Sequence, residues 1–403
     1  MAIRFSVLLP TRNRLDLLKF AIESVLRQDY ENWEIIVSDN DSTENIKDYI
    51  ASLNDPRVRY FRTASFLPVT ENWNNALRQA VGDYVIMLGD DDCLMPRYFS
   101  SLAPKIEKAG EPDFVYTSAY LFAYPGVMPG VPEGFLLSYS SKPIFQHSNR
   151  EHLLEIAEAR ELARRSLDFR MGFDYNMQFP LVKRSFIQEL APQGEFYQSP
   201  YPDYYASNVL MLKARKILVD PRPLVTIGIS PKSFGFFYFN NAEAQGNEFL
   251  KNLADKDIAE RIAPHVLPGT NMNTSWLASM ETIQKNYGTT ESLQVNYSRY
   301  RMLQICSVLA TAFAGAEGYK DGLRMLKPQL KKKEMITLYL PLLAIAFLVR
   351  NFSGRFRPRF ASKLMTLTGS HPRFAPPMLK GEYKSILNVY KDAENKGRAL
   401  VEP

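Results

Sequence analysis

The sequence is poor in the residues that build disulfide frameworks and cysteine-based metal sites. It contains only two cysteines in 403 residues, Cys93 and Cys306, and they lie far apart along the chain. Neither has a C-x-x-C partner or a nearby histidine at ligand spacing. This shortage gives no support to a disulfide-stapled domain and favours two reduced thiols in a cytosolic protein.

Glycine-rich phosphate-binding loops are absent as well. The G-x-G-x-x-G pattern of dinucleotide-binding proteins does not follow the first apolar run, and the G-x-x-x-x-G-K-[S/T] pattern of P-loop proteins does not occur. The glycine-rich loop that nucleotidyltransferases carry after their first strand is also missing. A phosphate group bound by this chain is therefore expected to be held by side chains and a metal ion.

The N-terminus lacks a long apolar run. The stretch MAIRFSVLLP has one early arginine and only a few apolar residues before its proline, which is too short for a signal peptide. We therefore expect a cytosolic location, with peripheral association with the inner face of the cell membrane as a further option.

Basic charge is in modest excess and is unevenly spread. The net charge is +6, and the last quarter of the chain contains Lys331 to Lys333 together with Arg350, Arg355, Arg357 and Arg359. This clustering favours an anionic surface as a partner, either a membrane or a polyphosphate. No DNA- or RNA-binding signature is present, so nucleic acid is not an expected partner.

A regular alternation of apolar strands and amphipathic helices fills the first part of the chain. Short apolar runs predict buried strands at residues 5–9, 33–37, 58–61, 84–88 and 114–116, with helices between them. This order predicts an α/β fold with a mainly parallel wound sheet and helices on both faces. At 403 residues we expect two domains, or one domain with a large appendage.

Three consecutive aspartates follow the fourth predicted strand. Gly89 breaks the apolar run, and Asp90, Asp91 and Asp92 come directly after it. Adjacent carboxylates repel one another, and a hard divalent cation removes that repulsion. For an isolated DDD tripeptide, a solvated acidic turn is the alternative. Since ligands of parallel sheets bind beyond the C-terminal strand ends, where the polar segments 11–13 and 38–43 also lie, the arrangement favours a metal site in one cleft.

Three sequence blocks together resemble the family 2 glycosyltransferases of the GT-A fold. SVLLPTRNR is similar to that family's first strand and nucleotide loop, and EIIVSDNDST to its second strand with an acidic residue. ENWNNALRQAVGDYVIMLGDDD is similar to the helix, strand and DXD motif that follow. The resemblance covers residues 4–100 well and 165–235 more loosely.

The resemblance implies a site for a nucleotide-sugar donor. Pro10, Thr11 and Arg12 would line the nucleotide pocket, and Asp39 would accept the N3–H of a uracil or thymine ring. Because the loop after the second strand is one residue longer than the commonest form, Asp41 is the alternative to Asp39.

The family motif also implies roles for Asn74 and the three aspartates. Asn74 would lie near the donor, Asp90 would contact the ribose or sugar, and Asp91 matches the variable middle of the motif. Asp92, together with Asp90, would hold Mn²⁺ or Mg²⁺ between the two phosphates. Gly89 stands where many members carry an aspartate, so the assignment within Asp90 to Asp92 can shift by one position.

The chain to about residue 235 is expected to complete the transferase domain. We place a nucleotide-binding half at about 1–118 and an acceptor half at about 119–235, with an irregular proline- and glycine-rich loop over 120–150. In the family, a helix opening with an acidic pair carries the catalytic base. Here Pro202-Asp203 takes that position, so Asp203 is the candidate base, and helix capping is its alternative role.

Three further residues complete the expected site. Glu195 and Asp174 are the fallback candidates for the base. The segment Pro223 to Gly235 lacks the histidine that the family often has there, and Lys232 could neutralise the departing diphosphate instead. A solvated loop lysine is the alternative for Lys232.

Residues 236–403 are expected to form a mostly helical C-terminal region. Within it, the uncharged run Met335 to Val349 is shorter than the about 20 residues that a membrane span needs. It is expected to be either a buried helix or a membrane-surface segment held on anionic headgroups by its basic flanks.

The function expected from the resemblance is metal-dependent, inverting sugar transfer. The donor would be a UDP- or dTDP-sugar, and the acceptor a hydroxyl of a glycan or lipid-linked glycan in surface polysaccharide assembly. The alternative is a non-catalytic protein that binds nucleotide sugars or glycans on the same fold.

Overall fold

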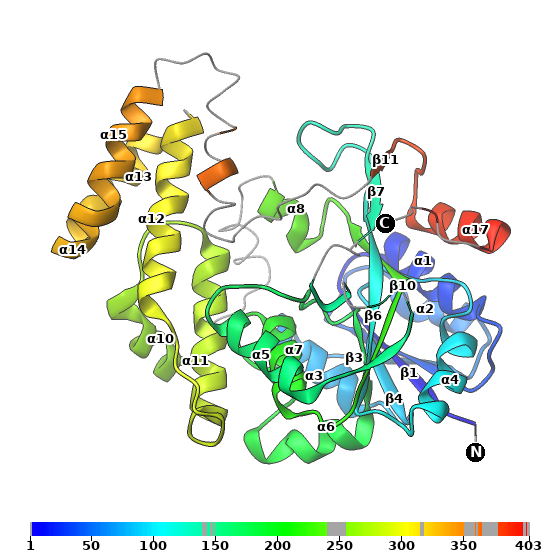
Figure 1. Cartoon of the computed structure of the whole chain (residues 1–403). Helices are drawn as coiled ribbons and strands as arrows, with labels where there is room; N and C mark the ends of the chain where they lie inside the picture. Colours follow the sequence, from blue (N-terminus) through cyan, green and yellow to red (C-terminus); the bar gives the residue numbers. More distant parts are fainter. Residues whose placement is uncertain are drawn as a thin grey trace. The chain divides into compact units, whose positions relative to one another are not determined.

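The structure is a computed structural model and describes residues 2–138, 143–145, 148, 150–239, 255–314, 318–349, 359, 362–364, 378–397 and 400 (Figure 1). The chain divides into two compact units. The first comprises Met1–Leu162, Gly172–Leu253 and Pro376–Pro403, and the second comprises Ala163–Met171 and Ala254–Ala375.

The first unit is built on one sheet that has 11 strands within the described residues. The strands are β1 Phe5–Thr11, β2 Trp33–Asp39, β3 Val58–Arg62, β4 Tyr84–Met87, β5 Cys93–Leu94, β6 Phe114–Ala123, β7 Phe135–Ser138, β8 His152–Leu154, β9 Pro180–Lys183, β10 Ile217–Ile229 and β11 Met378–Lys380. Their order is β11-β7-β6-β9-β4-β1-β2-β3, and β10 pairs with β5, β6 and β8 beside this path.

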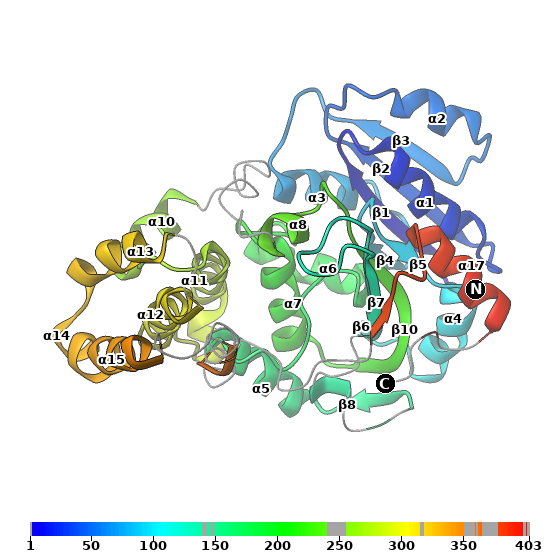
Figure 2. The ribbon, with the colours of Figure 1, turned by 90° about the horizontal axis from the view of Figure 1, so that it is seen from above.

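Helices cover both faces of this sheet. They are α1 Leu15–Leu26, α2 Ile46–Ser52, α3 Val69–Arg78, α4 Tyr98–Lys108, α5 Ile156–Leu167, α6 Arg184–Leu190, α7 Pro202–Lys213, α8 Phe234–Phe239 and α17 Ile386–Lys396. Figure 2 shows α1 and α4 on one face of the sheet and α3, α6 and α7 on the other. The predicted α/β class with a wound, helix-covered sheet is confirmed.

The four strands β3, β2, β1 and β4 form the parallel part of the sheet. The apolar residues of β1 are buried, as expected for a strand covered on both faces. The register places Thr11 beside Asp39, and Leu8 beside Met87. The C-terminal ends of β1, β2 and β4 therefore lie next to one another.

The remaining strands make the sheet mixed. The strand β9 runs antiparallel between β4 and β6, and β10 runs parallel to β6. The region 120–150 is less irregular than expected, because β6 continues to Ala123 and pairs with β7. Most of its proline and glycine residues lie in the turn between these two strands, and Pro143 begins a short 3-10 helix after β7.

The C-terminal part of the chain corrects the expected domain boundary at residue 235. Instead of remaining in a helical region up to residue 403, the chain returns to the first unit, where β11 pairs with β7. The helix α17 lies beside α1 in both views, and its Ile386, Val389 and Tyr390 are buried against Tyr120 and Phe122 of β6. Pairing between strands so far apart in sequence leaves no local signal.

The second unit is helical in its described part. Its helices include α10 Lys256–Ile262, α11 Asn271–Glu291, α12 Tyr297–Ala314, α13 Tyr319–Leu326, α14 Lys332–Glu334, the π-helical turn η5 Met335–Tyr339 and α15 Leu340–Val349. Residues 240–254, near the start of the expected helical region, lie outside the described residues. Among the described residues, no helix is both long and apolar enough to cross a bilayer.

Candidate functional site

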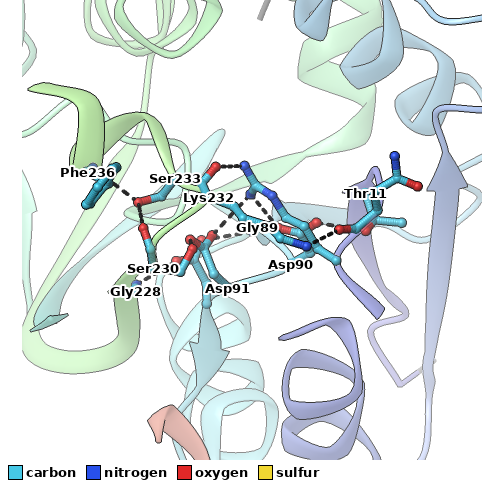
Figure 3. A network of polar contacts seen from close by, with 12 residues as sticks. Thr11, Gly89, Asp90, Asp91, Gly228, Ser230, Lys232, Ser233 and Phe236 are labelled. Carbon is cyan, nitrogen blue, oxygen red and sulfur yellow. Dashed lines mark hydrogen bonds and ion pairs between the residues drawn. The ribbon is translucent and has the colours of Figure 1, made fainter. Parts of the chain in front are cut away.

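Polar side chains gather where β1, β2 and β4 end and where the loop after β10 reaches them. Figure 3 shows Thr11, Asp90 and Asp91 close to Ser230, Lys232 and Ser233. Asp90, Asp91 and Asp92, which we call the acidic triplet, are all buried. The three carboxylates nevertheless have different partners, so each has its own chemistry.

Asp90 faces the first strand. Its Oδ2 accepts a hydrogen bond from Thr11 Oγ1 at 2.7 Å, and its Oδ1 accepts one from the guanidinium of Arg14 at 2.9 Å. Burial acts to lower the pKa of Arg14, but the carboxylates of Asp90 and Asp91 raise it overall. The guanidinium therefore stays charged and neutralises part of the triplet.

Asp91 faces the loop after β10. Its Oδ2 accepts a hydrogen bond from Ser230 Oγ at 2.8 Å, and its Oδ1 lies 3.9 Å from the guanidinium of Arg14. Burial raises the pKa of Asp91, the charge of Arg14 opposes the rise, and Asp90 adds to it. The positive charge of Arg14 therefore favours the ionised form of Asp91.

Asp92 is turned into the protein, where its carboxylate accepts hydrogen bonds from three donors. Its Oδ1 accepts from the amide of Gly228, and its Oδ2 accepts from the amide of Gly89 and from Gln178 Nε2 at 2.6 Å. Burial and the neighbouring Asp91 charge raise the pKa of Asp92 to about 8. These three donors anchor β4 to β10.

Two glycines allow this packing. A Cβ atom at Gly228 would lie 2.0 Å from the carbonyl oxygen of Asp91, and one at Gly89 would lie 2.5 Å from a carboxylate oxygen of Asp92. Both distances are shorter than real Cβ contacts allow. Glycine is therefore required at position 228 for the close approach of β10 to the triplet, and a side chain at position 89 would displace the carboxylate of Asp92.

We expect Asp92→Ala to lower the free energy of unfolding by about 2 kcal/mol or more, because three buried donors lose their acceptor. Chemical denaturation measures the change. Asp41→Asn is the control. In the described contacts the side chain of Asp41 pairs with the exposed Arg62, and loss of this surface ion pair should change the free energy of unfolding little. Equal stability of Asp92→Ala and wild type would contradict the anchoring role.

A second set of contacts ties the loop after β10 to the loop after β1. The guanidinium of Arg14 donates to the carbonyl of Lys232, and Lys232 Nζ donates to the carbonyl of Asn13 at 2.6 Å. Lys232 Nζ also lies 3.9 Å from Glu44. Lys232 thus belongs to the site rather than to a solvated loop, although more than half of its side chain is exposed.

Asp39 ends β2 and is completely buried. Its Oδ1 accepts from the amide of Ser42 at 3.0 Å, and its Oδ2 accepts from the hydroxyl of Tyr60 at 2.6 Å. Burial and the bond to Asp39 raise the pKa of Tyr60 to about 12, so this hydroxyl stays protonated and donates. Asp41, the alternative, is exposed and forms an ion pair with Arg62 at 2.8 Å.

The other residues expected at the nucleotide lie nearby. Pro10 lies near the end of β1, where it is in register with Ser38. The guanidinium of Arg12 lies 4.2 Å from the centre of the Phe66 ring. A planar cation on an aromatic ring is a surface on which a further planar group can stack.

Asn74 of α3 is bound by the backbone of Tyr197. Its Nδ2 donates to the carbonyl of Tyr197 at 2.8 Å, and its Oδ1 accepts from the amide of the same residue at 3.1 Å. Both polar ends of the side chain are engaged by the backbone. Asn74 therefore holds the segment before α7 against α3, and nothing in its contacts points to a donor.

Asp203 lies in the first turn of α7. The N-cap is Tyr201, whose side chain makes no capping bond, and Pro202 occupies the first helical position. Asp203 keeps part of its surface exposed, whereas Pro202 and Tyr204 on either side are buried. Its Oδ1 accepts from the amide of Tyr204 at 2.7 Å, so it assists the helix start without being the N-cap.

The surroundings of Asp203 suit a base. Burial raises its pKa to about 7, and the bond from the Tyr204 amide opposes the rise. A carboxylate with such a pKa accepts a proton more readily than an ordinary aspartate does. The rings of Tyr201 and Phe234 lie 5.3 Å apart and connect the start of α7 to the segment after Lys232.

The fallback bases are less suitable. Glu195 is exposed and pairs with Arg78 at 2.9 Å. Asp174 is buried, and its backbone amide and carbonyl both bind the hydroxyl of Tyr116. The ion pair of Glu195 and the burial of Asp174 make both less suitable than Asp203.

Sequence reasoning missed four residues of the site. Arg14 and Ser230 contact Asp90 and Asp91, and Gln178 and Gly228 contact Asp92. The signal for Arg14 was present, since it closes the SVLLPTRNR block. Gly228 and Ser230 lie in the segment Pro223 to Gly235, where only Lys232 was singled out, and Gln178 comes from a distant segment with no recognisable motif.

The donor set fits a cation bound together with a ligand better than a cation bound by protein alone. Among the described residues, no group of three or more His, Cys, Asp or Glu side chains could hold a metal ion. Asp90 and Asp91 supply hard oxygen atoms and already share one cationic group, Arg14. Mg²⁺ is commonly held by one or two carboxylates plus substrate phosphates, and this pair fits that pattern.

Comparison with known proteins supports the same class. The family model "Glycosyl transferase family 2" matches residues 6–150. The chain is 40% identical over 272 residues to the GalNAc(5)-diNAcBac-PP-undecaprenol beta-1,3-glucosyltransferase of Campylobacter jejuni subsp. jejuni serotype O:2, covering 65% of this chain and 80% of that protein. It is 31% identical over 87 residues to the UDP-Glc:alpha-D-GlcNAc-diphosphoundecaprenol beta-1,3-glucosyltransferase WfgD of Escherichia coli, covering 22% of this chain and 34% of WfgD. Other known relatives are matched over about half of their length.

Among solved structures, Staphylococcus aureus TarS 1–349 in complex with UDP-GlcNAc aligns with a TM-score of 0.48 and 12% identity, covering 99% of this chain and 93% of that one. The wound sheet, its acidic end and the sequence matches define the class of this protein as a glycosyltransferase of the GT-A type. The chain belongs to glycosyltransferase family 2.

Proposed function

We propose that this protein transfers a sugar from a UDP- or dTDP-sugar to a hydroxyl of a lipid-linked glycan, with inversion at the anomeric carbon. The observation that carries the proposal is the pairing of two chemistries in the first unit. One is the pair of carboxylates Asp90 and Asp91 beside the guanidinium of Arg14, and the other is the carboxyl group of Asp203 with its raised pKa.

The donor side rests on the ends of β1 and β2. The buried carboxylate of Asp39 would accept the N3–H of uracil or thymine, and the guanidinium of Arg12 would lie against the base. Adenine and cytosine carry no N–H at the corresponding ring nitrogen, so a carboxylate acceptor at this position favours uracil or thymine over them.

The diphosphate side rests on Asp90 and Asp91, which would hold Mn²⁺ or Mg²⁺. Such an ion, when bound, stabilises the negative charge that develops on the departing diphosphate. Two further positive charges lie close by. Arg14 pairs with Asp90, and Lys232 binds the carbonyl of Asn13 in the loop after β1. Asp92 is assigned to positioning, because its carboxylate accepts three hydrogen bonds from the protein, whereas the Asp39 carboxylate accepts two and keeps a free acceptor position on each oxygen.

The acceptor side rests on Asp203. An alkyl hydroxyl is a weak nucleophile, and a carboxylate within reach of its proton activates it during attack. Two relatives are named for acceptors linked through a diphosphate to undecaprenol, which supports a lipid-linked acceptor here. Such an acceptor would bring the protein to a membrane surface, and assembly of a surface polysaccharide is the process that this substrate suggests.

Binding of nucleotides tests the donor assignment. With Mn²⁺ present, UDP or dTDP should bind in calorimetry and raise the melting temperature, whereas ADP and GDP should do neither. Asp39→Asn should weaken UDP binding roughly tenfold by loss of the charged acceptor, and Asp41→Asn serves as the control that retains it. Preference for a purine nucleotide would contradict the proposal.

A further inference from the structure

One helical segment of the second unit exposes an unusual amount of apolar surface. Ile336, Leu340, Ile345, Phe347 and Leu348 are between 45% and 68% exposed. They lie on η5 and α15, the segment expected to be either a buried helix or a membrane-surface element. We call these five side chains the apolar stripe.

The stripe is one side of an otherwise well-packed helix. Tyr339 and Ala346 on the same segment are buried, and Leu338, Leu342 and Leu343 pack against the core of the second unit. The exposed positions 336, 340 and 347 to 348 recur at the spacing of helical turns, so they share a face. The segment is therefore neither fully buried nor long enough to span a bilayer.

Basic residues stand at the N-terminal end of the stripe. The three lysines Lys331 to Lys333 are all exposed. Two further exposed basic residues, Arg324 and Lys327, precede them in the sequence. The acidic Glu334 is engaged with Arg301 at 2.6 Å, and Asp321 pairs with Arg324 at 3.3 Å. The charge next to the stripe is therefore positive.

We propose that the apolar stripe and Lys331 to Lys333 form a surface that binds an anionic phospholipid bilayer. The apolar side chains would enter the boundary between headgroups and acyl chains, while the lysines contact phosphate groups. Exposed apolar patches rimmed by charge mark interaction sites, and the positive rim selects an anionic partner. The inference extends the proposed function, since a lipid-linked acceptor lies in a bilayer, but it rests on separate residues.

Sedimentation of the full chain with vesicles tests this surface. Wild type should sediment with phosphatidylcholine vesicles that contain phosphatidylglycerol, and much less with phosphatidylcholine alone or at high salt. The triple variant Ile336→Ser, Leu340→Ser and Phe347→Ser should lose binding roughly tenfold or more. Lys332→Gln with Lys333→Gln should reduce binding to the anionic vesicles only.

The matched control removes exposed apolar side chains from the first unit. Val81→Ser with Leu153→Ser takes away residues that are 47% and 53% exposed, and it should leave vesicle binding unchanged. Melting temperatures of all variants confirm folding, and UDP binding with Mn²⁺ should equal that of wild type, which separates this surface from the donor site.

Three results would overturn the inference. In the first, wild type stays in the supernatant with anionic vesicles, and in the second, the triple variant sediments as wild type does. In the third, the triple variant converts a wild-type dimer to a monomer without any change in vesicle binding, because the stripe would then be a contact between copies of this chain.

Discussion

Asp203→Asn is expected to abolish sugar transfer while leaving the protein folded and able to bind its donor. The substitution keeps the size of the side chain and its bond from the Tyr204 amide but removes its ability to take a proton. Loss of a general base typically costs a factor of roughly 10²–10⁴ in rate. Steady-state transfer measured against UDP affinity separates the two effects.

The wild-type enzyme should show the titration of this base. Because burial raises the pKa of Asp203 to about 7, the reactive ionised form is the minority at pH 6 and the majority at pH 8. The rate should therefore rise about tenfold between these values and then level off. A rate that is flat over this range would argue against Asp203 as the base.

The pH dependence of stability gives an independent control, because the contribution of Asp203 to stability falls with rising pH whereas the transfer rate rises. A carboxyl group whose pKa is raised by folding stabilises the folded state below its ordinary pKa of about 4 and loses that contribution as the pH rises towards 7. Asp203→Asn should therefore unfold at the same temperature as wild type, or a higher one, at pH 8. A marked loss of stability would mean that lost activity reflects unfolding.

Removal of the Asp90–Asp91 pair is expected to have the second largest effect. Asp91→Asn should weaken Mn²⁺ binding, and Mn²⁺-dependent UDP binding, by roughly tenfold or more, because one of two hard anionic ligands is lost. Electron paramagnetic resonance of Mn²⁺ measures the ion directly and does not depend on turnover. Asp90→Asn should act in the same direction and also weaken the hold on Thr11 and Arg14.

The comparison with Asp92 makes this prediction specific. If the ion lies at Asp90 and Asp91, Asp92→Ala loses mainly stability, whereas Asp91→Asn loses mainly ion affinity. In the reverse pattern, Asp91→Asn binds the ion as wild type does and a folded Asp92 variant does not bind it. That result would make Asp92 the metal ligand, as the family motif implies. Asp41→Asn serves as the acidic control outside the triplet.

The parallel part of the fold was predictable because its signals are local. The runs that became β1, β2, β3 and β4 are apolar, short and separated by helices, so their order dictates a wound sheet. The rest depends on contacts between distant segments. The antiparallel β9 between β4 and β6, and the return of β11 and α17, follow from packing that no local pattern encodes.

The site divides in the same way. Thr11, Asp39 and the acidic triplet could be placed at one end of the sheet because each directly follows or ends a strand. The direction of each carboxylate could not be predicted, because Gln178 and Gly228, which turn Asp92 inward, lie about 90 and 140 residues away along the chain. The contact of Asn74 with Tyr197 could not be predicted for the same reason, since Tyr197 belongs to the acceptor half.

Simultaneous measurement of UDP release and acceptor glycosylation tests the central claim most directly. With a UDP-sugar, Mn²⁺ and a polyprenyl-diphosphate-linked glycan, the account predicts one UDP for each sugar transferred, an inverted anomeric configuration in the product, and neither signal in Asp203→Asn. A product that retains the donor's configuration, or undiminished transfer by a folded Asp203→Asn enzyme, would contradict it.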